Sequence, residues 1–221
     1  MQILIVSATE AEVAPVVARL TPLRSEGMNA PLTHYTFGTR GVDVLVSGVG
    51  MVATAAWCSR VLTDSRYDLA LNLGVCGAFD TGLPLGAVVH VVSDRIAELG
   101  AEDDEAFVPF EDLHLPGACE FASRTVVSNP AIAALPAVRG ITVNTVHGNP
   151  RSIAAAVERF SPQVESMEGA AFMYACSIHD VPYAQLRAVS NIVEKRNRRA
   201  WQIGAAIENL GRAALRALEA A

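Results

Sequence analysis

Residues 164–191, VESMEGAAFMYACSIHDVPYAQLRAVSN, form a largely apolar stretch with two polar insertions. The first is Ser166-Met167-Glu168 and the second runs from Arg187 to Asn191. A glutamate, an arginine and an amide in apolar surroundings need partners, because burying such groups unpaired costs free energy. We expect Arg187, one strand away, to be the charge partner of Glu168. The remaining chain is then expected to position these groups around a bound ligand.

The composition of the whole chain is that of a well-buried globular protein. Hydrophobic residues make up 51% of the 221 positions and charged residues 18%, the opposite of a disordered segment. The net charge of −6 and the lack of a Lys/Arg stripe argue against a nucleic-acid-binding surface. We find no linker or internal repeat and expect a single domain over residues 1–221.

Cysteines and histidines are too scattered to predict a metal site or a disulfide framework. The four cysteines include no CxxC pair and are typical of buried thiols in a reducing compartment. The N-terminal segment MQILIVSATEAEV lacks a basic region and a cleavage site, so it predicts a first strand and not a signal peptide. No apolar run approaches membrane-spanning length. We expect a cytoplasmic protein with no cofactor, no metal and no membrane partner.

Strands alternate with helices along the chain, which predicts one α/β domain with a largely parallel or mixed central sheet. Strands are expected at 2–7, 32–37, 42–47, 69–73, 87–98, 124–127, 140–146, 163–166 and 183–190. Helices are expected at 8–20, 51–62 and 152–160, from the Met-Glu pair to 179, and at 199–218. Residues 99–118 are acidic, carry two prolines and show no periodicity, so they predict a long functional loop.

Two glycine motifs follow predicted strands. Gly48-x-Gly50-x-x-Ala53 resembles a dinucleotide fingerprint, but it follows the third strand and no acidic residue ends the next one. A tight turn that brings backbone close to a ligand is the better interpretation. Gly74-Val75-Cys76-Gly77 predicts either a wall of backbone N–H groups near a ligand or an ordinary turn, with equal weight.

Two glutamates are candidates for chemistry. Glu12 lies in the first turns of a helix, where most acids only pair with the helix dipole. The carboxyl end of an α/β sheet is also where ligands bind, so Glu12 is a candidate general base for water. Glu168 sits among apolar neighbours, where a carboxylate can accept hydrogen bonds from two sugar hydroxyls.

The chain resembles the purine nucleoside phosphorylase/nucleosidase superfamily over nearly its whole length. The resemblance is carried, in this order, by VSATEAEV, SGVGMVATA, LNLGVCGA, VESMEGAA and LRAVSN. Within the superfamily, VHGNPRSIAAAVERF and IVEKRNRRAWQIGAAIENL are most similar to the futalosine hydrolases. The resemblance implies a three-layer αβα sandwich around a mixed, partly barrel-like sheet, a nucleoside substrate and a homo-oligomer.

Four positions favour hydrolysis of a 6-oxopurine nucleoside. Asn72 stands where phosphorylases carry an arginine for phosphate, and Val75 where they carry a serine. Glu12 matches the water-activating glutamate of the methylthioadenosine/S-adenosylhomocysteine nucleosidases. Asn191 replaces the aspartate that protonates adenine there, and an amide can hydrogen-bond but cannot donate a proton outright. Hypoxanthine departs more readily than adenine, and an amide N–H would stabilise its developing charge.

The resemblance therefore implies a role for each candidate residue. Glu12 is the base, Glu168 binds the ribose hydroxyls, Arg187 fixes Glu168, and Asn191 holds the base. Substrate contacts are implied for Val49, Cys76, Gly77, Met167 and Ser190. An adenosine-type nucleosidase, a phosphorylase and a non-catalytic nucleoside-binding protein are the alternatives, in that order.

The 5′ end of the substrate is less well defined by the sequence. Futalosine carries a carboxybenzoyl group there, so a cation near an aromatic wall is expected. Arg151, Arg196 and Arg198 are candidates, each more often a solvated surface charge. Phe107 and Phe110 lie in the loop that reaches a partner subunit in related nucleosidases, with plain core packing as the competing interpretation.

Overall fold

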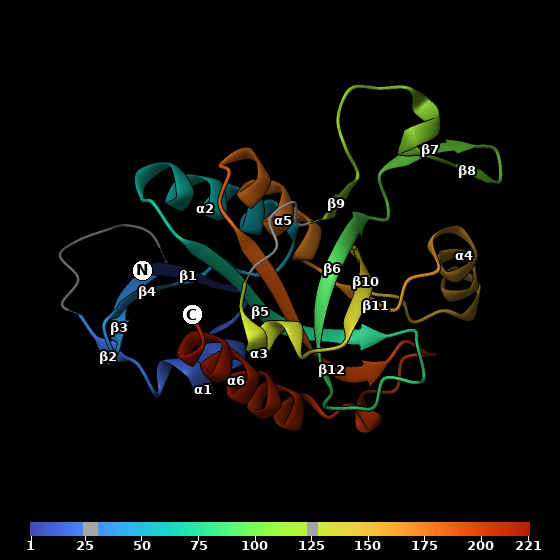
Figure 1. Ribbon diagram of the computed structural model, residues 1–221. Coiled ribbons are helices and arrows are strands. Elements are labelled where there is room, and N and C mark those ends of the chain that lie inside the picture. Colours follow the sequence, from blue (N-terminus) through green and yellow to red (C-terminus); the bar gives the residue numbers. More distant parts are fainter. Residues whose placement is uncertain (24–30, 123–127) are drawn as a thin grey trace.

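The computed structural model describes residues 1–23, 31–122 and 128–221 (Figure 1). Its strands are β1 (Gln2–Ser7), β2 (Thr21–Pro22), β3 (Leu32–Phe37), β4 (Arg40–Val46), β5 (Leu69–Ala78), β6 (Val88–Ile96), β7 (Gly100–Asp103), β8 (Ala106–Pro109), β9 (Glu120–Ala122), β10 (Ala137–Thr142), β11 (Val164–Ser166) and β12 (Tyr183–Ile192). Its helices are α1 (Glu10–Val17), α2 (Met51–Asp64), α3 (Pro130–Ala133), α4 (Pro150–Phe160), α5 (Gly169–Ile178) and α6 (Ile203–Glu219), with 3₁₀ turns η1 (Phe110–Leu113) and η2 (Arg198–Ala200).

The central sheet is mixed and partly closed. Its order is β11-β10-β6-β12-β5-β1-β4-β3-β2, with β9 paired to β6. Most central neighbours run parallel, whereas β6 runs antiparallel to β12. The end of β5 also pairs with β11, and this additional pairing closes β5, β11, β10, β6 and β12 into a ring. The expected partly barrel-like sheet is confirmed.

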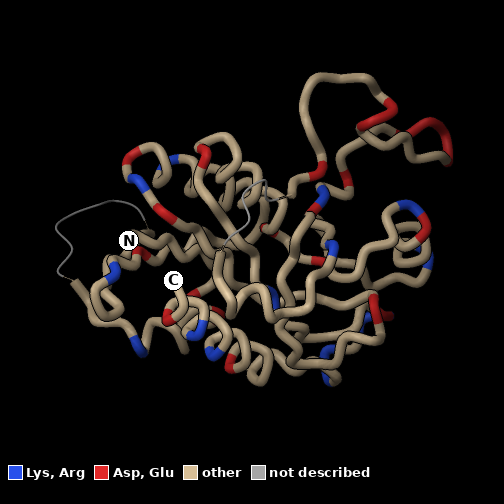
Figure 2. Tube along the Cα trace, viewed as in Figure 1, with Lys and Arg blue, Asp and Glu red and all other residues tan. Residues whose placement is uncertain are grey.

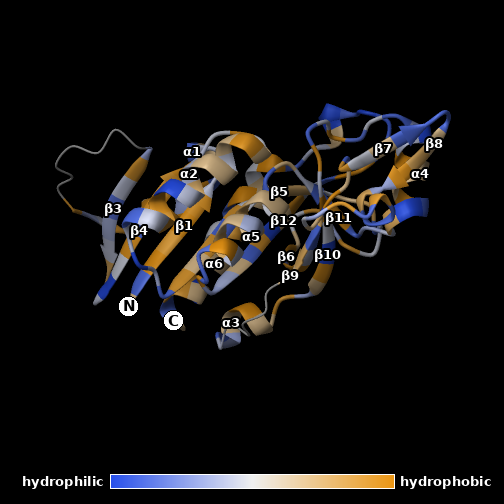
Figure 3. Cartoon of the chain, turned by 90° about the horizontal axis from the view of Figure 1, so that it is seen from above, coloured by the Kyte–Doolittle hydropathy of each residue, from blue (hydrophilic) through white to orange (hydrophobic). Residues whose placement is uncertain are grey.

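Helices cover both faces of the sheet, so the three-layer αβα sandwich is confirmed. Figure 1 shows α2 and α5 on one face and α1 and α6 on the other. Each face has its own apolar core: one gathers residues of α2 and α5, the other residues of α1 and α6. Because both faces are covered, β1 and β5 are almost continuously buried and apolar (Figure 3).

Residues 100–113 are not the irregular loop that the sequence predicts. β7 and β8 form a two-stranded hairpin, followed by η1. Its turn places Asp104 at φ 54°, in the left-handed region. The Glu-Asp-Asp-Glu sequence contains no glycine or asparagine that would predict this conformation. Acidic residues gather on this projecting hairpin and on η1 (Figure 2).

Other element boundaries differ from prediction at their ends. The strand expected at 140–146 begins earlier, at Ala137, and the last helix begins at Ile203 and not at 199. The short β9 and α3 were not predicted. The strand expected at 124–127 lies outside the described residues. Within residues 1–23, 31–122 and 128–221, no helix is long and apolar enough to cross a membrane.

Candidate active site

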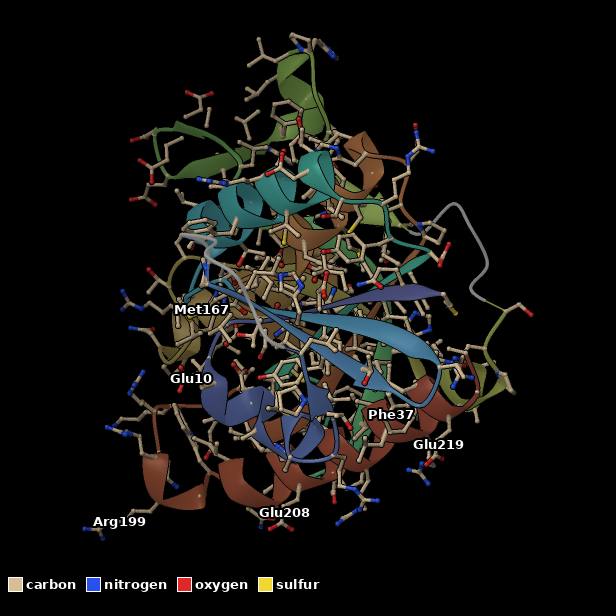
Figure 4. All side chains as sticks on the ribbon, turned by 90° about the vertical axis from the view of Figure 1, so that its left-hand side faces the viewer. Glu10, Phe37, Met167, Arg199, Glu208 and Glu219 are labelled. Carbon is tan, nitrogen blue, oxygen red and sulfur yellow. The ribbon has the colours of Figure 1, made fainter. Side chains whose placement is uncertain are left out.

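A cavity of about 350 Å³ opens where the carboxyl ends of β1, β5 and β12 meet the end of β11. This is the edge at which α/β sheets bind ligands. Met167, which lines this cavity, is labelled in Figure 4 on the same side of the view as Glu10 of α1. The sequence-predicted residues that line it are Glu12, Val49, Cys76, Gly77, Met167, Glu168, Ser190 and Asn191. The structure therefore brings together groups from five segments that are distant in sequence.

The Glu12 carboxylate is fixed by local helix capping and by β5. Thr9 and Glu12 form a capping box, in which the Thr9 backbone N–H and hydroxyl donate to Oε2 at 3.1 and 2.8 Å. The backbone N–H of Val75 donates to Oε1 at 3.0 Å. Glu12 is 8% exposed and still lines the cavity. It is thus a carboxylate that is held in place and faces the cavity.

Glu168 is held from two sides at the start of α5. The backbone N–H of Gly50 donates to Oε1 at 3.1 Å, and the Arg187 guanidinium lies 3.5 Å from Oε2. Gly50 has φ 97°, a conformation that favours glycine. The Gly48-x-Gly50 turn therefore directs the Gly50 backbone N–H at the Glu168 carboxylate. The expected Glu168–Arg187 pair is confirmed.

Arg187 does not line the cavity; it lies behind the site as the centre of a buried polar network. It is 1% exposed and also donates to Gln185 at 2.8 Å and to Asn72 at 2.5 Å. Gln185 in turn donates to Asp94 at 2.9 Å. Gly74 leaves room for the guanidinium, since a Cβ there would lie 2.1 Å from an Arg187 nitrogen. Such fully satisfied networks hold their members in one arrangement.

Asp94 at the far end of this network gives stability a pH dependence. Burial raises the pKa of its carboxyl to about 6, although hydrogen bonds from Gln185 and Thr142 oppose the rise. Between pH 4 and 6 the folded state therefore binds more protons than the unfolded state. The contribution of Asp94 to the free energy of unfolding accordingly falls as pH rises through this window, by on the order of 2 kcal/mol.

This dependence is measurable by urea unfolding of the wild type and Asp94→Asn at pH 4, 5, 6 and 7. The stability of the variant relative to the wild type is expected to rise across the series. Asp64→Asn, at an exposed position on α2, controls for loss of a carboxylate. A constant difference between wild type and Asp94→Asn would contradict the assignment.

Asn191 sits on an irregularity of β12. The register against β5 shifts between Val189 and Asn191, and Ser190 bridges the gap through its hydroxyl, 3.1 Å from the Cys76 carbonyl. The Ser190 hydroxyl also lies 2.8 Å from Oδ1 of Asn191, while Nδ2 donates to the Ile192 carbonyl at 3.1 Å. Within the described ranges 1–23, 31–122 and 128–221, Ile192 is the one acceptor of Nδ2, so its second hydrogen is available to a ligand. Burial raises the pKa of Cys76 to about 12, so the neighbouring thiol is an uncharged part of the wall.

Two wall residues were missed by the sequence analysis. Glu165 is 4% exposed, and His147 donates to it through its backbone N–H at 3.1 Å and faces it with Nδ1 at 2.6 Å. Both line the cavity. Glu165 precedes the recognised Met-Glu pair, and only the non-local pairing of β11 with β5 brings it to the site.

The arginine and phenylalanine candidates divide between different places. Arg196 lines the cavity, with its guanidinium carbon 5.4 Å from the centre of the Trp201 ring, which also lines it. Arg198 lies 6.0 Å over the same ring but outside the cavity lining. Arg151 and Phe107 line an adjoining cavity, and Phe110 packs near Gly117. Trp201, Ile203 and Ile207 are further lining residues that the sequence did not single out.

The family model of the phosphorylase superfamily matches residues 2–221. The chain belongs to the phosphorylase superfamily. A curated futalosine hydrolase of Streptomyces coelicolor is 34% identical over 224 residues, covering 95% of this chain and 92% of that protein. The predicted resemblance to futalosine hydrolases is thus confirmed in the sequence.

Solved structures agree with this fold. A 5′-methylthioadenosine/S-adenosylhomocysteine nucleosidase of Colwellia psychrerythraea, in complex with adenine, matches with a TM-score of 0.84 and 23% identity over 99% of this chain and 95% of that one. The futalosine hydrolase of Helicobacter pylori matches with a TM-score of 0.85 and 13% identity over 99% and 97%. The nucleoside phosphorylase-like fold is confirmed.

Asn72 has a structural task in this member of the phosphorylase superfamily. It is 1% exposed, donates to the Val6 carbonyl at 3.0 Å and accepts from Arg187. Both ends of the amide are therefore used inside the protein, away from the cavity. Among the described residues that line the cavity, Arg196 is the single arginine, and Lys is absent.

Proposed function

We propose that this protein is an N-ribosyl hydrolase that cleaves futalosine to hypoxanthine and dehypoxanthine futalosine, in menaquinone biosynthesis. The observation that carries the proposal is the meeting of Glu12, Glu168 and Asn191 in one cavity of a chain 34% identical to a futalosine hydrolase. A cavity of about 350 Å³ lies within the range that small-molecule sites occupy.

Water is the nucleophile that the site supports. Asn72 stands where an arginine would be needed for phosphate, and its amide is hydrogen-bonded to the Val6 carbonyl and to Arg187. Without that arginine, phosphate lacks its strongest kind of contact, a charge-assisted hydrogen bond. Glu12, by contrast, is a fixed carboxylate at the cavity wall, which suits a base that orients and deprotonates water.

The reaction follows from glycosidic chemistry. The bond between C1′ and N9 stretches first and leaves an oxocarbenium-like ribose. Glu168, fixed by Gly50 and Arg187, accepts hydrogen bonds from the 2′ and 3′ hydroxyls and lies near the growing positive charge. Glu12 directs water to C1′. Met167 and Val49 supply apolar contacts to the ribose or the base.

Asn191 favours hypoxanthine as the departing base. Its free Nδ2 hydrogen stabilises the negative charge that develops on the purine, as a preorganised donor does. Adenine departs poorly without protonation, whereas O6 of hypoxanthine delocalises the charge. At the other end of the cavity, Arg196 beside Trp201 offers a cation and an aromatic surface to the carboxybenzoyl group.

The assembly and compartment are proposed on the same basis. We expect a homo-oligomer in which the β7–β8 region, with Phe107 and Phe110, reaches the site of a neighbouring subunit, and a cytoplasmic enzyme. The hairpin projects from the body of the protein (Figure 1), as an element with such a role must. Sedimentation of the purified protein tests the assembly directly.

One assay separates the candidate activities. The protein is incubated with futalosine, inosine and methylthioadenosine, with and without phosphate, and free base is quantified. Phosphate-independent release of hypoxanthine from futalosine is expected. Phosphate-dependent release would overturn the hydrolase, and release from methylthioadenosine alone would support the adenosine-type nucleosidase. No release from any substrate would support a nucleoside-binding protein.

A further inference from the structure

Three paired strands, β11, β5 and β12, form the cavity wall around Gly77. Gly77 of β5 pairs with Glu165 of β11 on one side and with Asn191 of β12 on the other. A Cβ added to Gly77 would lie 3.2 Å from Nδ2 of Asn191 and 3.4 Å from Cγ of Glu165. The two side chains therefore converge over the same glycine. Glu165 thus stands at the end of the cavity where Asn191 holds the departing base.

Glu165 binds one partner by two contacts. Its oxygens accept from the backbone N–H of His147 at 3.1 Å and meet Nδ1 of the same residue at 2.6 Å. The His147 ring also packs at a steep angle against the Phe79 ring, with centroids 5.8 Å apart and an interplanar angle of 66°. Nε2 of His147 has no hydrogen-bond partner within the part of the chain that the structure describes. The ring is fixed, and one nitrogen remains for a ligand.

Resting on the proposed hydrolysis of futalosine, we propose that His147 is a further catalytic residue, a general acid whose Nε2–H donates to the N7/O6 edge of the departing base, and that Glu165 is its positioning residue. A histidine whose Nδ1 is held by a buried carboxylate is fixed in orientation, so that Nε2 points to one place. This supplies what Asn191 cannot, because an amide hydrogen-bonds but does not give up a proton. The preference for hypoxanthine then rests on O6, which accepts from Nε2–H, whereas adenine carries an amino donor at that position.

The proton balance of the step is complete. When the C1′–N9 bond breaks, its electron pair moves to the purine, and the proton on His147 Nε2 passes to the N7/O6 edge. Water forms the new bond to C1′ and gives its proton to Glu12. Return of the Glu12 proton to solvent and uptake of one proton by His147 restore the enzyme, so no other reactant is needed.

Charged groups from several elements surround His147. The charged groups that line the same cavity are Glu12, Glu165, Glu168, Glu194 and Arg196. His147 also borders the adjoining cavity, whose charged groups are Glu98, Glu102, Arg151 and Arg159.

The test compares His147→Phe, which keeps a ring without a donor, with Glu165→Gln and the wild type. The wild type must first release hypoxanthine from futalosine, and failure at this point would overturn the proposed function itself. His147→Phe is then expected to lower kcat about 10²-fold or more with little change in KM, as for loss of a general acid. Glu165→Gln is expected to lower kcat by a smaller factor, about 10-fold.

His179→Phe is the matched control, because His179 bonds to Ser59 between α2 and α5 and does not line the cavity. It removes the same group and is expected to keep kcat. A futalosine analogue methylated at N7 adds a readout that a structural role would not move. Its base leaves without protonation, so His147→Phe is expected to cleave it within about threefold of the wild type. Equal loss on both substrates, or no loss on futalosine, would overturn the proposal.

A measurement on the wild type covers the case in which the variants fail to fold. Histidine labelled with ¹⁵N is followed by NMR while hypoxanthine is added, and His147 is assigned from nuclear Overhauser effects between its ring protons and those of Phe79. Binding is expected to shift the Nε2 resonance of His147 and to slow exchange of its proton. Saturating hypoxanthine with an unchanged Nε2 resonance would show that the ring does not meet the base.

Discussion

Glu12→Gln is expected to reduce kcat for futalosine about 10³-fold, within the range for loss of a general base. The amide keeps the size of the side chain and can still accept from the Val75 N–H. It cannot take a proton from water at neutral pH. The decisive measurement is single-turnover release of hypoxanthine, paired with a calorimetric titration of hypoxanthine into the same variant. Binding of the product is expected to stay within about threefold of the wild type.

The neighbouring acid of α1 provides the control for this prediction. Glu10 lies two residues before Glu12 in the first turn of the same helix and is exposed. Glu10→Gln therefore removes the same charge at the same helix end. Its kcat is expected to match the wild type. If Glu12→Gln also kept near-normal rates, water would need another base, and the assignment of Glu12 would be wrong.

Arg187→Ala is expected to destabilise the fold by about 3–5 kcal/mol, the cost of breaking a buried ion pair by removing one partner. Glu168, Gln185 and Asn72 would each lose a donor in the interior, and the large side chain would leave a void. For a chain of this size the melting temperature is expected to fall by roughly 10 °C. Calorimetry of wild type and variant measures both quantities.

Two further variants test whether this loss of stability comes from the hydrogen-bonding fork of Arg187. Arg187→Lys keeps the charge but not the planar fork that reaches three partners, so it is expected to lose part of the stability. Arg199→Ala removes an exposed arginine of η2, labelled in Figure 4, and is expected to change the melting temperature by less than about 2 °C. An equally small change for Arg187→Ala would mean that the network contributes no net stability.

The sequence predicts the sandwich well because its strongest signals are local. Buried runs such as residues 2–7 and 69–73 become central strands, since helices on both faces leave them no exposed side. Glu12, Glu168 and Asn191 were found for a related reason. Each follows or ends a recognisable strand, and those ends share one edge of the sheet.

What the sequence did not predict depends on non-local contacts. His147 lies in a loop without periodicity, and its partner Glu165 reaches the cavity only because β11 turns back to pair with β5. No residue near His147 or Glu165 predicts the pairing of β11 with β5. The β7–β8 hairpin was missed because its turn places an aspartate, not a glycine, in the left-handed conformation.

Because β12 bulges at Ser190, the pairing of the strand does not depend on which side chain stands at position 191. Main-chain bonds around the bulge run from Gln202 to Ser190 and from Val193 to Ala78, and none involves the Asn191 amide group. Exchange of amide for carboxyl at this point leaves the strand pairing intact. Codons for asparagine and aspartate differ by a single nucleotide, so under the role proposed for Asn191 a lineage with this scaffold stands one mutation from a change of base preference. The scaffold thus keeps substrate choice open to selection at little risk to folding.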